Sequence, residues 1–138
     1  MIASWKASYL RIFKTKWFAR FARQQRIEDR ALCDAIERAE KGQIDADLGG
    51  GVIKQRIARP KEGRSGGYRS IVFFRSGDRA FFVYGFPKSV RDNIRRDEMK
   101  GFKALAHEML SYDDAALAKA LKSGAVLEVE CDEQDISK

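Results

Sequence analysis

The sequence predicts an α+β fold in which a helical hairpin packs on a twisted antiparallel sheet, with extra helices on the C-terminal side. Two amphipathic segments precede three runs of β-branched and aromatic residues, and two further amphipathic segments follow them. Hydrophobic residues make up 44% of the 138 residues, which is enough apolar surface for one core. We expect a single domain over residues 1–138, with its core at about 13–129 and an acidic tail at 132–138.

Two apolar stripes with helical spacing predict the hairpin, which follows a short strand at residues 11–13. The stripes consist of Trp17, Phe18, Phe21 and Ala22, and of Leu32, Ala35, Ile36 and Ala39. Gly42 predicts the end of the second helix, because glycine readily takes the left-handed conformation found after a helix.

Residues 52–58, 68–75 and 79–86 predict three antiparallel strands, because they are rich in β-branched and aromatic side chains. The short link at 76–78 makes the last two strands a hairpin. We expect a longer basic loop at 60–67. Residues 49–51 are glycines without the Lys-Ser/Thr ending of a phosphate-binding loop, so we expect a turn or a close approach of strands there.

The C-terminal part predicts two more helices and a last strand. The third helix has an apolar stripe made of Met99, Phe102, Ala106, Met109 and Leu110. Residues 111–114 resemble a capping box that opens a fourth helix, which ends near Gly124. Residues 126–129 are expected to form the last strand.

Composition excludes several classes of protein. No stretch approaches the roughly 20 apolar residues of a membrane helix, and residues 1–16 lack the apolar centre of a signal peptide. We therefore expect a cytoplasmic protein without a membrane partner. Cys33 and Cys131 have no CxxC spacing and no neighbouring histidine cluster, so we expect reduced thiols buried as small hydrophobic groups.

The net charge of +7 is distributed unevenly along the chain. Residues 54–100 contain thirteen Lys and Arg against five Asp and Glu, whereas residues 101–138 contain four against eight. This charge points toward a polyanion, although a solvated basic surface is the common alternative, and the concentration on the sheet favours binding to nucleic acid.

Alternation along the first predicted strand places Lys54 and Arg56 on one face. Arg69 on the next strand and Lys88 just after the third can join them if the strands pair as expected. Five further residues are expected to contact RNA. Arg59, Lys61 and Arg64 extend the basic region into the loop, and Tyr68 and Tyr84 are candidates for stacking on bases.

RNA cleavage fits this set of residues, because RNA supplies its own nucleophile, the 2′-hydroxyl. Guanidinium groups suit the oxygens of the reacting phosphate, and a lysine near other cations can act as the proton acceptor. The only histidine, His107, lies within a predicted helix, where a structural role is expected. The acidic residues are scattered, so we expect no metal site and no cofactor.

Three segments carry a resemblance to a known family. Residues 46–59, residues 65–69 and residues 78–86 followed by Lys88-Ser89 resemble RelE/HigB-type toxins of type II toxin-antitoxin systems, over about residues 13–129. The resemblance implies a helical hairpin on a twisted antiparallel sheet, metal-independent cleavage of messenger RNA, free or on the ribosome, and thereby inhibition of translation. It also implies a cognate antitoxin, expected to be a small helix-turn-helix protein through which operator DNA is contacted.

The resemblance also implies the catalytic residues. By position these are Lys54 as proton acceptor, Arg56 and Arg69 as phosphate stabilisers, and Lys88 at the leaving group. One position departs from the family pattern, because well-studied members carry a tyrosine where this chain has Ile94. That substitution leaves stacking or proton transfer at this place in doubt.

Two other functions stay open at this point. A ParE-like toxin shares the fold and poisons DNA gyrase without cutting RNA, so it has no need of the basic residues at 54, 56 and 69. A non-catalytic protein that binds the antitoxin and helps it repress their operator is the other alternative, and the missing tyrosine is compatible with it.

Overall fold

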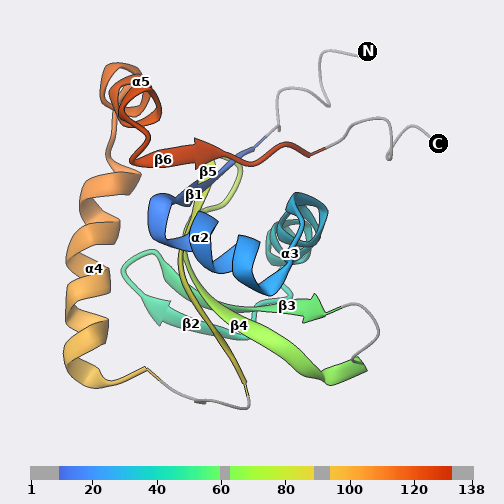
Figure 1. Ribbon diagram of the computed structural model, residues 1–138. Helices are drawn as coiled ribbons and strands as arrows, with labels where there is room; N and C mark the ends of the chain where they lie inside the picture. Colours follow the sequence, from blue (N-terminus) through green and yellow to red (C-terminus); the bar gives the residue numbers. More distant parts are fainter. Residues whose placement is uncertain (1–9, 60–62, 89–93, 132–138) are drawn as a thin grey trace, which may run out of the picture.

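A computed structural model describes residues 10–59, 63–88 and 94–131 and shows an α+β fold, as predicted (Figure 1). The elements in chain order are β1 (Arg11–Thr15), α2 (Lys16–Gln25), α3 (Asp29–Glu40), β2 (Ala46–Gly49), β3 (Val52–Arg59), β4 (Gly63–Arg75), β5 (Arg79–Pro87), α4 (Arg96–Leu110), α5 (Asp114–Ser123) and β6 (Val126–Glu128). No helix in the described ranges is long and apolar enough to cross a membrane.

The sheet has six strands in the order β2-β3-β4-β5-β1-β6. Strands β3, β4 and β5 pair antiparallel, which confirms the predicted three-stranded core of the sheet. Strand β1 lies parallel to β5, and β6 pairs antiparallel with β1 at the edge. Arg11 on β1 binds both carboxylate oxygens of Glu128 on β6 at 2.9 Å, and these hydrogen bonds raise the pKa of Arg11.

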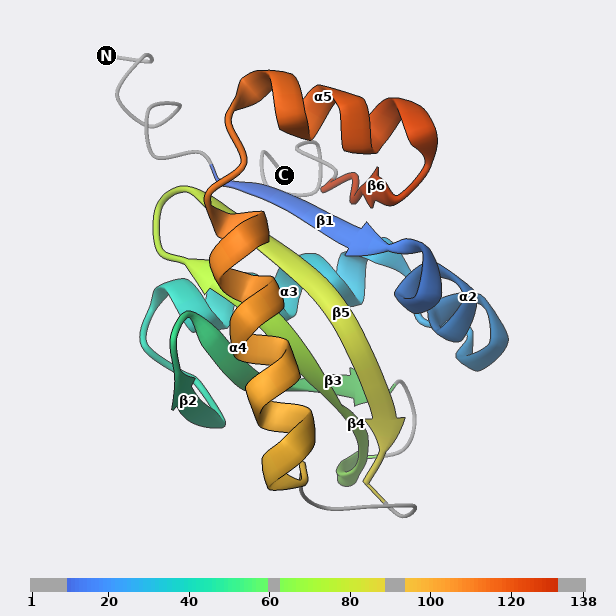
Figure 2. The same cartoon turned by 90° about the vertical axis from the view of Figure 1, so that its left-hand side faces the viewer.

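Each face of the sheet carries its own apolar core, because alternate side chains of a strand point to opposite faces. Helices α2 and α3 cover one face, where Phe18, Leu32 and Ile36 pack on Ile57 and Phe82 (Figure 1). Helix α4 crosses the other face (Figure 2). Its buried residues Ala106, Met109 and Leu110 belong to the same core as Phe73 and Phe81, which lie on β4 and β5.

The helix ends follow from local chemistry. The Thr15 hydroxyl accepts from the amide of Phe18 at 3.1 Å and caps α2, so the helical hairpin begins directly after β1. The fourth predicted helix is present as α5. However, Asp113 caps it by accepting from Ala116 at 2.8 Å, which places the helix start two residues after the expected Ser111.

Two sheet details differ from prediction. The expected loop at 60–67 is strand from Gly63 onward, since β4 begins there. A side chain on Gly67 would place its Cβ 2.6 Å from the carbonyl oxygen of Ile57, so glycine permits this close pairing. In addition, residues 46–49 form the unpredicted edge strand β2, which the glycines at 50 and 51 turn into β3 with positive φ angles.

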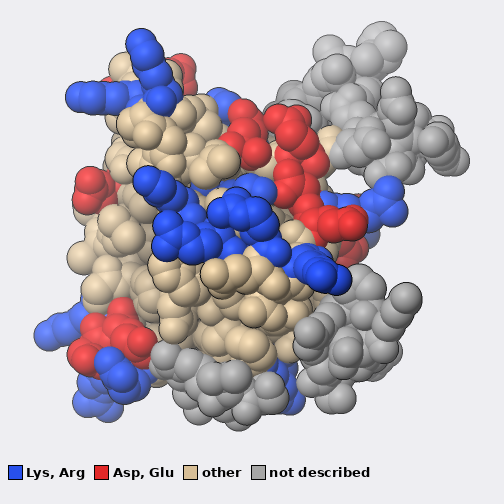
Figure 3. All heavy atoms as spheres, in the orientation of Figure 1, with Lys and Arg blue, Asp and Glu red and all other residues tan. Residues whose placement is uncertain are grey.

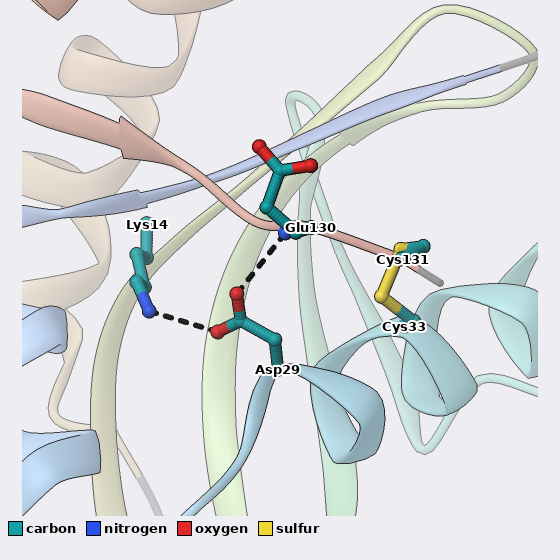
Figure 4. Close-up of a disulfide and its surroundings, with 5 residues drawn as sticks. All are labelled: Lys14, Asp29, Cys33, Glu130 and Cys131. Atoms are coloured by element: carbon teal, nitrogen blue, oxygen red, sulfur yellow. Dashed lines mark hydrogen bonds and ion pairs between the residues drawn. A yellow bond between two sulfur atoms is a disulfide. The ribbon is translucent and has the colours of Figure 1, made fainter. Parts of the chain in front are cut away.

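The prediction of two reduced thiols is wrong in this structure, because Cys33 and Cys131 form a disulfide across a sequence separation of 98 residues (Figure 4). The chain after β6 continues along β1, where the amide of Val129 donates to the carbonyl of Ile12, and it then reaches α3. Asp29 at the start of α3 accepts from the amide of Glu130 at 3.0 Å and pairs with Lys14 at 2.8 Å. Sequence spacing carries no sign of this return path.

Candidate nucleic-acid interface

Two neighbouring strands bring three of the four predicted catalytic residues together. On β3, Lys54 and Arg56 lie on the face that α4 crosses, as their alternation with the buried Gln55 requires. Arg56 pairs directly with Arg69 of β4 in the antiparallel register. We refer to Lys54, Arg56 and Arg69 as the basic cluster.

The basic cluster is unusually buried for charged residues. Arg69 is only 9% exposed, and the Lys54 side chain is 17% exposed. Charged groups in such positions normally have their polar atoms satisfied, because an unpaired buried charge is costly. Yet Nη1 of Arg69 has no hydrogen-bond partner among the residues that the structure describes. The cluster therefore retains hydrogen-bonding capacity for an anion.

One acidic residue that the sequence reasoning missed contacts the cluster. The Asp45 Oδ2 lies 3.3 Å from Nε of Arg69 and 3.9 Å from Nζ of Lys54. The amide of Asp45 donates to the side-chain oxygen of Gln55 at 3.1 Å. Asp45 precedes the edge strand β2, which carries no strand-like run of residues, so no sequence signal placed it here.

Gln55 fixes this arrangement from the opposite face of the sheet. It is 1% exposed, and its amide nitrogen donates to the carbonyls of Ala35 at 2.8 Å and Gln43 at 3.1 Å. The glutamine thus ties α3, β3 and the segment before β2 together. Asp45 is held at the edge of the basic cluster by this buried polar side chain.

The fourth predicted catalytic residue, Lys88, lies at the end of β5 and is exposed. Its amide is 3.5 Å from the carbonyl oxygen of Gly67, two residues before Arg69. The register pairs Phe86 with Arg69, so alternation along β5 places Lys88 on the same face as the basic cluster. Along β5, Lys88 lies two residues beyond Phe86, the residue that pairs with Arg69.

The residues predicted to contact RNA are distributed differently. Lys61 lies outside the described residues. The backbones of Arg59 and Arg64 lie at the end of β3 and the start of β4, where Arg59 pairs with Gly63.

The two tyrosines point to opposite faces of the sheet. Tyr68 is 1% exposed and lies under the helical hairpin, where its hydroxyl donates to Oε1 of Gln25 at 3.0 Å. It is therefore inaccessible to a base. Tyr84 pairs with Ile71 on the face of the basic cluster, and its ring lies 4.8 Å from that of Trp17.

Ile94, where the family pattern has a tyrosine, is partly buried against the core beneath α4. The isoleucine therefore contributes apolar packing. Tyr84, which belongs to the rim of the same core, brings an aromatic hydroxyl to this face of the sheet.

A second group of basic residues lies on α2. This helix exposes Lys16, Arg20 and Arg23 and contains no acidic residue. Figure 3 shows Lys and Arg gathered in a band across the face of the molecule on which α2 lies. The ring contact between Trp17 of α2 and Tyr84 connects this helix with the sheet face that carries the basic cluster.

The structure is that of a small α+β protein with a basic cluster on one face of its sheet. The family described as RelE toxin of RelE / RelB toxin-antitoxin system matches residues 10–129. The match covers well over half of the chain, so the chain belongs to the RelE toxin family. It is a toxin of a toxin-antitoxin system, and its family implies an antitoxin partner. No curated protein matches the chain.

Proposed function

We propose that the chain is a metal-independent endoribonuclease that cleaves messenger RNA and thereby inhibits translation, either on the ribosome or on free RNA. The single observation that carries the proposal is the buried guanidinium of Arg69, which has one nitrogen without a hydrogen-bond partner among the described residues and lies beside Lys54 and Arg56. Such a group suits a bound phosphate, because charge-assisted hydrogen bonds to phosphate repay the cost of burying a cation.

The proposed reaction uses the 2′-hydroxyl of the RNA as nucleophile. Lys54, reacting as the neutral amine, accepts the proton of this hydroxyl, and the 2′-oxygen attacks the adjacent phosphorus. Arg56 and Arg69 stabilise the additional negative charge on the phosphate oxygens. The bond from phosphorus to the 5′-oxygen breaks, and Lys88 donates a proton to the leaving oxygen. The products are a 2′,3′-cyclic phosphate and a 5′-hydroxyl end.

The remaining basic residues have a different proposed role. Exposed Lys16, Arg20 and Arg23 of α2 bind the RNA backbone outside the reacting nucleotide, which raises affinity without sequence preference. Tyr84 is the candidate for a base contact on the same face as the basic cluster. We do not retain Tyr68 for this role, since it is buried on the other face.

We also propose the setting in which this activity operates. The toxin acts in the cytoplasm, where its substrate is found, and a small helix-turn-helix antitoxin neutralises it. Operator DNA is then contacted only through the antitoxin. Support for this part comes from membership in the RelE toxin family.

Induced expression in cells tests the proposal. Growth and the positions of new transcript ends are compared for wild type, Lys54→Ala, Arg69→Ala and the control Arg75→Ala. Arg75 lies on the same strand as Arg69, but at its exposed far end. Wild type and Arg75→Ala are expected to arrest growth and cut transcripts, and the two cluster variants to lose about 100-fold or more of the cleavage rate. Intact transcripts in arrested wild-type cells would instead favour gyrase poisoning, and intact transcripts in cells that keep growing would favour a binding role.

A further inference from the structure

The contact between Asp45 and the basic cluster is longer than the two shortest ion pairs among the described residues, and at 3.3 Å it matches exposed pairs such as Arg75–Asp78. Asp45 lies 3.3 Å from Arg69 and 3.9 Å from Lys54, whereas Lys14 and Asp29 are 2.8 Å apart. Charge-assisted hydrogen bonds between nitrogen and oxygen are normally 2.7–2.9 Å long. Asp45 thus neutralises the cluster without forming the short bonds that would hold it there.

Burial of the two partners is unequal. Arg69 is 9% exposed, whereas the Asp45 side chain is 31% exposed. The Asp45 backbone is anchored, because its amide donates to Gln55. Rotation of the side chain can therefore move the carboxylate into solvent while the backbone and Arg69 stay in place.

We propose that Asp45 is an internal stand-in for phosphate. In the free toxin its carboxylate occupies the anion position next to Lys54 and Arg69, and binding of RNA exchanges it for a phosphate of the substrate. This inference rests on the proposed function, because it assumes that the basic cluster binds RNA phosphate. Asp45 is then a positioning residue that keeps the buried guanidinium of Arg69 neutralised until RNA arrives.

Because a phosphate must displace the Asp45 carboxylate, the site favours ligands that also contact other residues of the protein. A carboxylate on the same chain competes at a high effective concentration, so a single free phosphate displaces it poorly. An RNA strand that also contacts Lys88 or the basic residues of α2 gains additional binding energy and can displace it. The unpartnered nitrogen of Arg69 offers the incoming phosphate a hydrogen bond that no described residue takes.

Binding of a non-cleavable 2′-O-methyl RNA oligonucleotide, measured by fluorescence anisotropy, tests the inference. Asp45→Asn and Asp45→Ala remove the competing charge and are expected to lower Kd by about fivefold, the upper end of what one partly exposed ion pair contributes. The matched control is Asp47→Asn, which removes the same charge from an exposed position on β2, where Asp47 contacts Gly49. Its Kd is expected to change by less than about twofold.

The outcomes separate the inference from the proposed function. Tighter binding by the Asp45 variants alone supports the exchange, and damage to the fold cannot produce such a gain. Unchanged or weaker binding by both Asp45 variants overturns it, provided that Arg69→Ala still weakens binding. If Arg69→Ala binds this RNA as tightly as wild type, the basic cluster is not the phosphate site, and both the proposed function and the exchange fail.

Discussion

The two faces of the sheet treat buried polar groups in opposite ways. On the helical-hairpin face, the amide of Gln55 is fully buried, and both its nitrogen and its oxygen have hydrogen-bond partners. On the face that α4 crosses, Arg69 is nearly as buried but keeps a nitrogen without a partner in the described part of the chain. A satisfied buried group stabilises the fold, whereas an unsatisfied one lowers stability and can be retained for a function.

The largest expected effect on stability comes from breaking the disulfide between Cys33 of α3 and Cys131, at the edge of the sheet face that α2 and α3 cover. A crosslink over 98 residues is expected to contribute about 4 to 5 kcal/mol to the free energy of unfolding. Urea denaturation of the oxidised protein should show this loss after addition of reductant. The variant Cys33→Ala/Cys131→Ala should be insensitive to reductant, and an oxidised wild type equally insensitive would show that the bond contributes nothing.

That crosslink also bears on the compartment. Cytosolic proteins usually keep their thiols reduced, so we expect free thiols at Cys33 and Cys131 while the toxin is in the cytoplasm and the disulfide after oxidation. Thiol alkylation before lysis, followed by mass spectrometry, measures the two states. A fully oxidised pair in rapidly quenched cells would contradict the cytoplasmic part of the proposal.

Two substitutions to leucine measure how much the buried polar group on each face of the sheet contributes to stability. Gln55→Leu removes the hydrogen bonds to the carbonyls of Ala35 and Gln43 and to the amide of Asp45, and is expected to cost about 2 to 4 kcal/mol of unfolding free energy. Arg69→Leu removes an incompletely satisfied cation and is expected to change stability by less than about 1 kcal/mol, or to raise it. Urea denaturation measures both. Equal losses would mean that the two faces do not differ.

The smallest effects distinguish the two tyrosines. Tyr68→Phe removes the hydroxyl that donates to Gln25 and is expected to lower stability by about 1 kcal/mol, with unchanged RNA cleavage. Tyr84→Phe keeps the ring packed against Trp17 but removes a hydroxyl on the face of the basic cluster. It is expected to leave stability unchanged and to alter the cleavage rate only severalfold. A large loss of cleavage in Tyr68→Phe would contradict the assignment of faces.

Much of the fold could be predicted because periodicity is a local property. The alternation in β3 and the helical stripes of α2 and α3 each follow from a few neighbouring residues, and the pairing of Arg56 with Arg69 follows once β3 and β4 are adjacent. The edge strand β2 escaped prediction because its four residues include no β-branched or aromatic side chain.

The missed features depend on contacts between distant parts of the chain. The disulfide requires the segment after β6 to return to α3, which no spacing of two cysteines reveals. Asp45 contacts Lys54 and Arg69 only because β2 folds back along β3 and Gln55 binds the Asp45 amide from the opposite face of the sheet. A single acidic residue in a polar segment has no sequence pattern, so the cluster was expected to be purely basic.

We propose that this toxin cuts RNA through the 2′-hydroxyl, with its own side chains and no metal. The most direct measurement is the chemistry of the RNA ends that purified wild-type toxin produces in the presence of EDTA, with ribosomes supplied in a parallel reaction. We expect 5′-hydroxyl and 2′,3′-cyclic phosphate ends, which Arg69→Ala should fail to generate. Ends that carry a 5′-phosphate, or RNA that stays intact in both reactions, would contradict it.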